Sequence, residues 1–85
     1  MHEISVVNNL IRILETVCKE NKAKKVIKIN IRINPYSCLD EGNLNFVFSV
    51  LTKGKEIYKG TRIELKRDGK PDDREYIVEN IEIEV

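Results

Sequence analysis

The stretch KKVIKINIRIN, residues 24–34, decides the fold of this 85-residue chain. Isoleucines alternate with polar residues along it, with Ile27, Ile29, Ile31 and Ile33 placed between Lys28, Asn30, Arg32 and Asn34. A period of two with β-branched residues on one side is typical of a strand that has one buried and one solvated face. Pro35 ends the strand. The apolar face of the strand must pack against other elements to be buried.

Two amphipathic segments on either side of this strand can cover that face. Residues 4–18 repeat apolar residues at steps of three and four, which predicts a helix; the stripe is Ile4, Val7, Leu10, Ile11, Leu14, Val17 and Cys18. Lysines suit the negative end of its dipole and mark its termination: Lys19, Lys22, Lys24 and Lys25. A second helix is predicted to begin at its N-cap Asp40 and to stop at Gly54. Its apolar stripe is Leu44, Val47, Phe48 and Leu51, widened by Phe46 and Val50.

Two further strands are predicted in the C-terminal half. TRIELK, residues 61–66, alternates Ile63 and Leu65 with charged residues, and RDGKPDDRE, residues 67–75, is rich in turn-forming residues. YIVENIEIEV, residues 76–85, is interpreted as the antiparallel return of a hairpin, with one face formed by Ile77, Ile81, Ile83 and Val85. The order helix, strand, helix, strand, strand predicts an α+β fold, a two-layer sandwich with two helices on one face of a three-stranded mixed sheet. A single domain over residues 1–85 is expected, and the strand order is left open.

Composition removes several classes of function. Fifteen Lys+Arg against fourteen Asp+Glu give a net charge of +1, so neither nucleic acid nor an anionic membrane is an expected partner. Polar residues interrupt the first 21 positions, which excludes a signal peptide and predicts a cytoplasmic protein. Cys18 and Cys38 stand twenty residues apart without a CxxC motif, which indicates neither a zinc site nor a disulfide. Cys18 fits the buried helical stripe; for Cys38, in a loop, the pattern favours no role.

Catalysis by side chains is not expected. The only histidine is residue 2, so no serine, cysteine or lysine in the body of the chain has an imidazole base. The four glycines are isolated and match no phosphate-binding fingerprint. An acidic group in the predicted turn, formed by Asp72, Asp73 and Glu75, could attract a hard cation, and a solvated turn explains it equally well.

The amino terminus itself carries the candidate metal site, formed by Met1, His2 and Glu3. The Met1 α-amine and the His2 backbone nitrogen can close a five-membered ring on a metal, and Nδ1 of His2 can close a six-membered ring with the same backbone nitrogen. The backbone nitrogen of Glu3 supplies a fourth donor. Four nitrogens in a plane suit Ni(II) or Cu(II) better than Zn(II) or Mg(II). Met1 is expected to be retained because residue 2 is large, and binding should weaken in mild acid because the donors must lose protons.

Three stretches of the chain resemble the nickel-insertion accessory proteins of hydrogenase maturation, the HypA type. They are MHE at residues 1–3, AKKVIKINIRI at 23–33 and LNFVFSVLTKGKEIYKGTRIEL at 44–65. The resemblance spans residues 1–66 and resumes over 76–85. It implies a fold of two helices on a three-stranded sheet and a metallochaperone that carries nickel to [NiFe] hydrogenase, and in some organisms to urease. It also implies a nickel site at Met1, His2 and Glu3, with a maturation GTPase and the hydrogenase large subunit as partners.

One departure from the family is large. The family places a zinc-binding domain with paired CxxC motifs between its last two strands, where this chain has only a turn around residues 66–75, so the zinc site is not carried over. The alternative function is therefore a zinc-less, metal-free module that docks a maturation partner. A nucleic-acid-binding domain using Lys19 to Lys28 and Arg32 is the least favoured, because the chain is nearly neutral and this stretch lacks aromatics. Exposed strand edges leave a homodimer open.

Overall fold

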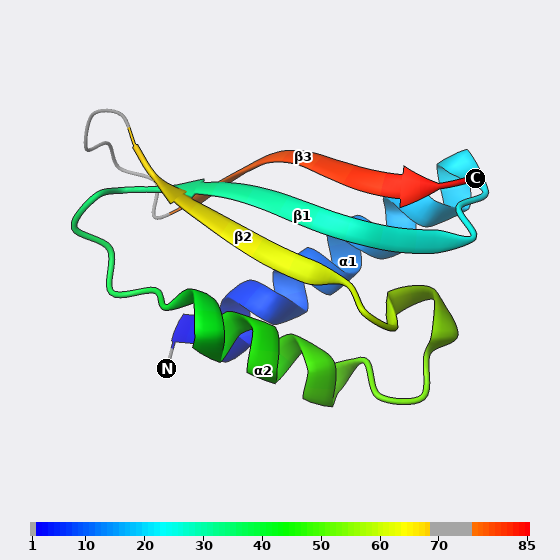
Figure 1. Ribbon diagram of the computed structural model, residues 1–85, viewed down its shortest axis with the longest axis horizontal. Coiled ribbons are helices and arrows are strands. Elements are labelled where there is room, and N and C mark those ends of the chain that lie inside the picture. The colour runs from blue at the N-terminus through cyan, green and yellow to red at the C-terminus, as the bar shows by residue number, and fades with distance from the viewer. Residues whose placement is uncertain (1, 69–75) are drawn as a thin grey trace.

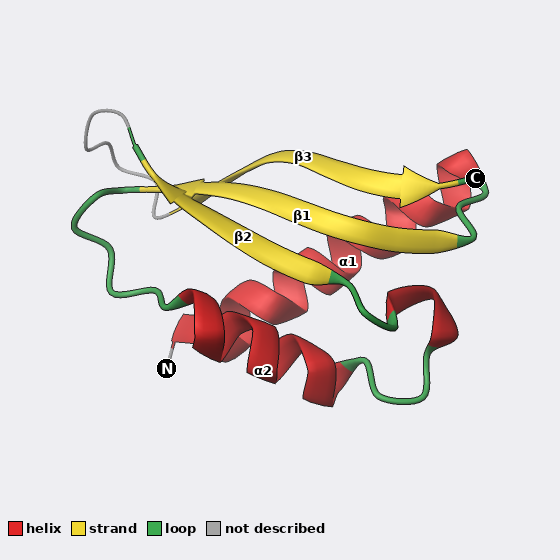
Figure 2. Cartoon of the chain, in the orientation of Figure 1, coloured by secondary structure: helices red, strands yellow, loops and turns green. Residues whose placement is uncertain are grey.

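The computed structural model describes residues 2–68 and 76–85 and has the predicted α+β architecture. Two long helices cover one face of a three-stranded sheet (Figures 1 and 2). In chain order the elements are α1 (His2–Asn21), β1 (Lys25–Ile33), α2 (Glu41–Leu51), the short 3₁₀ helix η1 (Glu56–Tyr58), β2 (Arg62–Arg67) and β3 (Tyr76–Glu84). The predicted acidic turn residues Asp72, Asp73 and Glu75, with most of the predicted turn, lie outside the described residues.

The sheet has the order β2-β1-β3, so β1 is the central strand. β1 and β2 run parallel, as the helical crossover between them predicts, and β3 runs antiparallel, which makes the sheet mixed. The predicted hairpin is wrong, because β3 pairs with β1 and not with β2. Arg67 at the end of β2 and Tyr76 at the start of β3 both pair with Ile33, one on each side of it.

Two register shifts change which residues of the sheet face the helices. On β1 the shift between Val26 and Lys28 makes Ile27 an extra residue, so Val26 is fully buried while Ile27, predicted on the core face, is 46% exposed. On β3 the shift lies between Asn80 and Val78.

The shift on β3 moves one predicted core residue, Ile77, off the core face, and Val78 takes its place. Val78 pairs with the buried Ile31 and packs against the core, whereas Ile77 pairs with Arg32 of the open face. Val85, also predicted on the core face, is 70% exposed. Ile81 and Ile83 do pack against the core as predicted.

The core lies between the sheet and the two helices. β1 contributes Val26, Ile29, Ile31 and Ile33, α1 contributes Val6, Val7, Leu10 and Leu14, and α2 contributes Leu44 and Phe48. The prediction that Phe46 and Val50 widen the buried stripe of α2 is wrong, since they are 69% and 54% exposed. Ile4 and Leu51, predicted within their helical stripes, are also largely exposed. A helix that touches the core along one side buries only a stripe about 100° wide, and these residues lie outside it.

The ends of both helices have recognisable caps. Asp40 is the N-cap of α2, as predicted, because its Oδ2 accepts a 2.9 Å hydrogen bond from the Asn43 backbone N–H. α1 ends in a Schellman-type turn in which Lys22 adopts a left-handed conformation (φ 53°) and the Ala23 N–H donates to the Cys18 carbonyl. The lysines after Cys18 therefore include the residue that terminates α1.

Side chains of α2 close the outward edge of β2. The Ile63 N–H donates to Asn45 Oδ1 at 2.8 Å, and Asn45 Nδ2 donates to the Ile63 carbonyl at 2.9 Å. One step further, the Leu65 N–H donates to Glu41 Oε2 at 2.9 Å. These bonds tie α2 to β2 and satisfy backbone groups that an edge strand otherwise exposes.

Asn45→Ala is expected to lower the free energy of unfolding by about 1–3 kcal/mol, because it leaves the N–H and carbonyl of Ile63 without their partner. Urea denaturation measures this change. Asn43→Ala is the matched control, since Asn43 is exposed on the same helix and the hydrogen bond that it donates to Asp40 comes from its backbone N–H. The control should change stability by no more than about 0.5 kcal/mol. Equal loss in both variants would show that Asn45 has no special role at the edge.

Candidate metal centre

The first turn of α1, which contains two of the three residues of the predicted metal site, rests against the folded core. His2 is the first residue of α1; Met1 lies outside the described residues. Glu3 is only 8% exposed, Val6 is 4% exposed and Val7 is fully buried. Burial of the third, sixth and seventh residues anchors this turn, which limits the fraying expected of a chain terminus.

Backbone nitrogens at this position are free for a metal. The first four N–H groups of an α-helix have no carbonyl partner within the helix, and they include those of His2 and Glu3. Among the described residues no other group accepts a hydrogen bond from either N–H. Coordination through these nitrogens would therefore cost α1 none of its own hydrogen bonds.

The charge of the proposed ligand set also suits a helix N-terminus. The positive end of the helix dipole disfavours a bare dication there. Two deprotonated backbone nitrogens, however, bring two negative charges, while the amine and the imidazole are neutral when they coordinate. A divalent ion held by this set has no net charge, so the dipole opposes it little.

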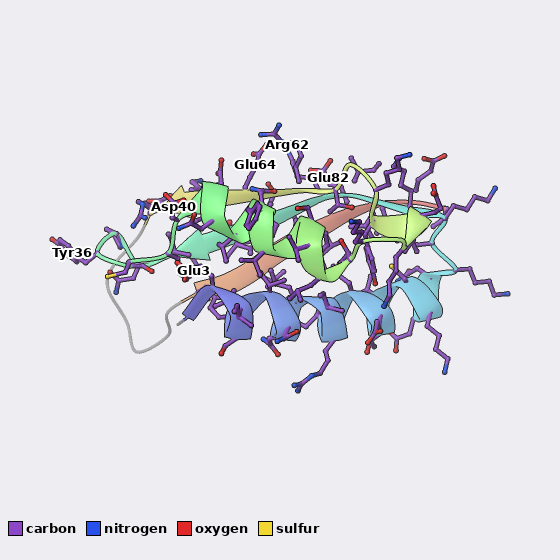
Figure 3. All side chains as sticks on the ribbon, turned by 90° about the horizontal axis from the view of Figure 1, so that it is seen from below. Glu3, Tyr36, Asp40, Arg62, Glu64 and Glu82 are labelled. Carbon is purple, nitrogen blue, oxygen red and sulfur yellow. The ribbon has the colours of Figure 1, made fainter. Side chains whose placement is uncertain are left out.

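Glu3 directs its side chain away from solvent. Figure 3 shows Glu3 at the start of α1, on the side of the helix that faces the sheet layer. Within residues 2–68 and 76–85, no hydrogen bond or ion pair reaches its carboxylate.

Two more carboxylates stand at the same end of the molecule. The start of α2 lies beside the start of α1 in both views (Figures 1 and 3), which places Asp40 and Glu41 on this side. Both already have structural partners, since Asp40 caps α2 and Glu41 binds the Leu65 N–H. The described part of the chain contains no cluster of three or more His, Cys, Asp or Glu side chains that could hold a metal.

The two cysteines do not form a second site. Cys18 is partly buried against the core, as predicted, and burial raises the pKa of its thiol. A thiol that keeps its proton at neutral pH is a poor metal ligand and a poor nucleophile. Cys38 is exposed in the loop before α2 and is also a free thiol, so the pair supplies neither a disulfide nor a thiolate site.

Two other parts of the described surface were candidates for a binding site, and neither presents a better set of ligands than the amino terminus. A shallow hollow of about 360 Å³ lies beside the C-terminal end of α2 and η1, lined by Thr52, Tyr58 and three lysines. On the open face of the sheet, Lys28 forms ion pairs with Glu64 (3.4 Å) and Glu82 (3.7 Å), and Arg32 pairs with Glu79. Two cations of the basic stretch suggested for nucleic acid are thus engaged within the sheet. No described helix is long and apolar enough to cross a membrane.

Comparison with known proteins identifies a family model that matches residues 1–70, described as hydrogenase/urease nickel incorporation, metallochaperone, hypA. The curated relatives that the chain matches include three, each named hydrogenase maturation factor HypA. The one from Actinobacillus succinogenes is 38% identical over 53 residues, which are 62% of this chain and 47% of the relative. Those from Dehalococcoides mccartyi and Methanocella arvoryzae are 31% and 32% identical, over 79% and 74% of this chain and 56% and 55% of the relatives. The chain spans about half the length of these relatives.

A solved structure supports the same fold. The solution structure of the Ni metallochaperone HypA from Helicobacter pylori superimposes with a TM-score of 0.76 and covers 96% of this chain and 97% of that one. Sequence identity is 18%, so this likeness bears on the fold alone. It agrees with the two helices and three-stranded sheet expected from the sequence.

Proposed function

Because the chain belongs to the HypA family of hydrogenase/urease nickel-incorporation metallochaperones, we propose that it binds one nickel ion at its amino terminus and carries it to hydrogenase. The family is one of metallochaperones, which agrees with the expectation that the chain is not an enzyme. The observation that carries the proposal is the anchored first turn of α1, where the backbone nitrogens of His2 and Glu3 have no hydrogen-bond partner among the described residues.

Four nitrogen donors define the proposed site. The α-amine of Met1, the backbone nitrogens of His2 and Glu3, and Nδ1 of His2 would form fused chelate rings in one plane, a geometry that Ni(II) accepts. The amine and imidazole lose their protons near neutral pH, with ordinary pKa values of about 7.7–8.0 and about 6.5. Nickel binding is therefore expected to weaken as the pH falls below neutrality.

Delivery requires that the bound ion reach another protein. We propose transfer in the cytoplasm through the maturation GTPase to the hydrogenase large subunit. The proposed site suits transfer because its donors belong to three consecutive residues at one chain end, so a partner's ligands can replace them one at a time. α1, which carries the site, is the proposed docking element for these partners.

The test is a calorimetric nickel titration of untagged protein that begins at Met1, compared with the same protein acetylated at its α-amine. We expect one ion per chain and a diamagnetic complex, since square-planar Ni(II) has no unpaired electrons and leaves sharp NMR signals. Acetylation removes one donor and should weaken binding at least about tenfold. Equal binding by both forms, or a paramagnetic complex, would exclude this site.

The alternative function is a metal-free module that docks a maturation partner. The observation in its favour is the exposed apolar surface of α2, where Phe46 and Val50 lie one turn apart and are 69% and 54% exposed. Absence of nickel binding by the unmodified protein, together with a measurable complex with the maturation GTPase that Phe46→Ala weakens, would support this function over nickel carriage.

A further inference from the structure

The two edges of the sheet differ in how their backbone groups are satisfied. The outward edge of β2 is closed, because Asn45 occupies both backbone groups of Ile63 and Glu41 accepts the Leu65 N–H. The Asn45 amide imitates one residue of a neighbouring strand, with a donor and an acceptor on the same side. A further strand cannot pair with β2 unless it first displaces these side chains.

The outward edge of β3 is open. The Glu84 carbonyl accepts a 2.6 Å hydrogen bond from the Lys24 N–H, so the peptide groups of Glu84 face β1. Peptide groups alternate in direction along a strand, and those of Ile83 and Ile81 consequently point away from β1. Within residues 2–68 and 76–85, no backbone or side-chain group bonds to them.

α1 provides an apolar surface beneath this open edge. Asn9 on α1 donates a 2.6 Å hydrogen bond to the hydroxyl of Tyr76 on β3, so the flank of α1 that carries Asn9 faces β3. Ile13 and Val17 follow Asn9 at four-residue steps and share that flank, and both are only partly buried. Figure 1 shows α1 crossing behind β2 and β1 and reaching β3 near the C-terminal end of that strand. An added strand would find apolar contacts below it.

A bulge limits the length of the open edge. The register shift between Asn80 and Val78 interrupts the regular geometry of β3, and bulges commonly end strand pairing. The regular stretch therefore runs from Asn80 to Glu84. Within this stretch, the peptide groups of Ile81 and Ile83 point outward, which is enough to pair with a short added strand.

Charge selects the kind of strand that fits. Residues 76–85 contain three glutamates and no basic residue. On the inner side, β1 supplies the complementary cations, since Arg32 pairs with Glu79 and Lys28 pairs with Glu82. Glu84 has no ion pair among the described residues. A second copy of β3 would bring further glutamates to this edge, which like-charge repulsion disfavours.

We propose that the open edge of β3, residues 80–84, binds an extended segment of a partner protein in which aliphatic residues alternate with lysine or arginine. The segment adds a fourth strand to the sheet. Its aliphatic side chains lie over Ile13 and Val17, and its basic side chains lie beside Glu82 and Glu84. Main-chain hydrogen bonds to Ile81 and Ile83 supply the pairing, as in other cases of strand addition. This surface is separate from the amino-terminal nickel site.

Amide hydrogen exchange in the free protein tests the difference between the edges. The amides of Ile81 and Ile83 should exchange fast, whereas those of Ile63 and Leu65 should be protected by Asn45 and Glu41. Protection of Ile81 and Ile83 that grows with protein concentration would overturn the proposal, because a second copy would then occupy the edge. Protection that does not depend on concentration would also overturn it, since the edge would then be closed within the chain.

Binding is tested with a blocked eight-residue peptide of alternating valine and lysine. It should slow the exchange of the Ile81 and Ile83 amides, and the same peptide with glutamate in place of lysine should not bind. Ile83→Pro, which removes one outward N–H at a position that edge strands tolerate, should weaken binding at least about tenfold. Failure of the valine–lysine peptide to protect these amides, or equal binding of the glutamate peptide, would overturn the proposal.

A charge reversal keeps the test valid if the proline variant does not fold. Glu84→Lys should weaken binding of the valine–lysine peptide several-fold. Glu56→Lys, the same charge reversal at an exposed position of η1, should leave peptide binding unchanged. Equal weakening by both would mean that the peptide responds only to net charge. Nickel titrations of the same variants should match the unchanged protein, so this proposal and the proposed nickel site stand or fail independently.

Discussion

His2→Ala is expected to bind nickel at least about a hundredfold more weakly than the unchanged protein, measured by calorimetry on untagged chains that begin at Met1. The substitution removes the imidazole and with it one chelate ring, and a terminal amine with two backbone nitrogens then has to hold the ion with water as the fourth ligand. Stability should change little, because Val6 and Val7 anchor the first turn and both are retained.

A second variant separates the position of the imidazole from its mere presence. His2→Ala combined with Asn8→His restores the composition but places the ring at an exposed position further along α1. An imidazole there cannot form a chelate ring with the terminal nitrogens, so nickel binding should stay as weak as in His2→Ala. Recovery of tight binding in the double variant would contradict a site at Met1, His2 and Glu3.

Phe48→Ala is expected to lower the free energy of unfolding by about 3–5 kcal/mol. Phe48 is 2% exposed, and its ring meets that of Tyr58 edge to face, with centroids 5.7 Å apart and an interplanar angle of 76°. Truncation would leave a cavity between α2, η1 and β1 and remove the support for Tyr58. Folded proteins are only marginally stable, so urea denaturation should show a large shift of the midpoint.

Phe46→Ala provides the matched control on the same helix. Phe46 is 69% exposed, and its loss should change the free energy of unfolding by no more than about 0.5 kcal/mol. Nickel binding should be the same as in the unchanged protein. Comparable destabilisation by the two phenylalanine substitutions would mean that α2 packs against the sheet with a different face from the one described.

Helix positions followed from the sequence because their periodicity is local. The stripe of α1 through Val7, Leu10 and Leu14 identified the buried side, and the structure confirms it. The width of the stripe on α2 did not follow. Phe46 and Val50 are as apolar as their buried neighbours, and only the position of the sheet decides that they face outward.

Strand pairing could not be obtained from the sequence. Consecutive strands most often pair, which favoured a hairpin between β2 and β3. In the structure, Asn45 and Glu41 of α2 occupy the outward edge of β2. β3 pairs with the remaining edge of β1. The exposure of Ile27 and the position of Ile77 on the open face of the sheet follow from two bulges. A bulge moves residues to the other face without any local sign in the hydrophobic pattern.

For the candidate metal site, too, the sequence and the structure contribute different information. The donors at Met1, His2 and Glu3 are evident from residue types, because chelate rings form between atoms only a few bonds apart. The structure adds that Glu3 is buried and that the first turn of α1 rests on the core. Neither could be read from three residues, since both depend on where α1 lies relative to β1 and α2.

By itself, the sequence determined the α+β class, the limits of the central strand and the chemistry available at the amino terminus, because each depends on residues close together along the chain. Only the tertiary structure decided the strand order, the closed edge of β2, the open edge of β3 and the outward face of α2. These features depend on contacts between residues far apart in the chain, such as Asn45 with Ile63 and Asn9 with Tyr76. Such contacts leave no periodic pattern that a single sequence displays.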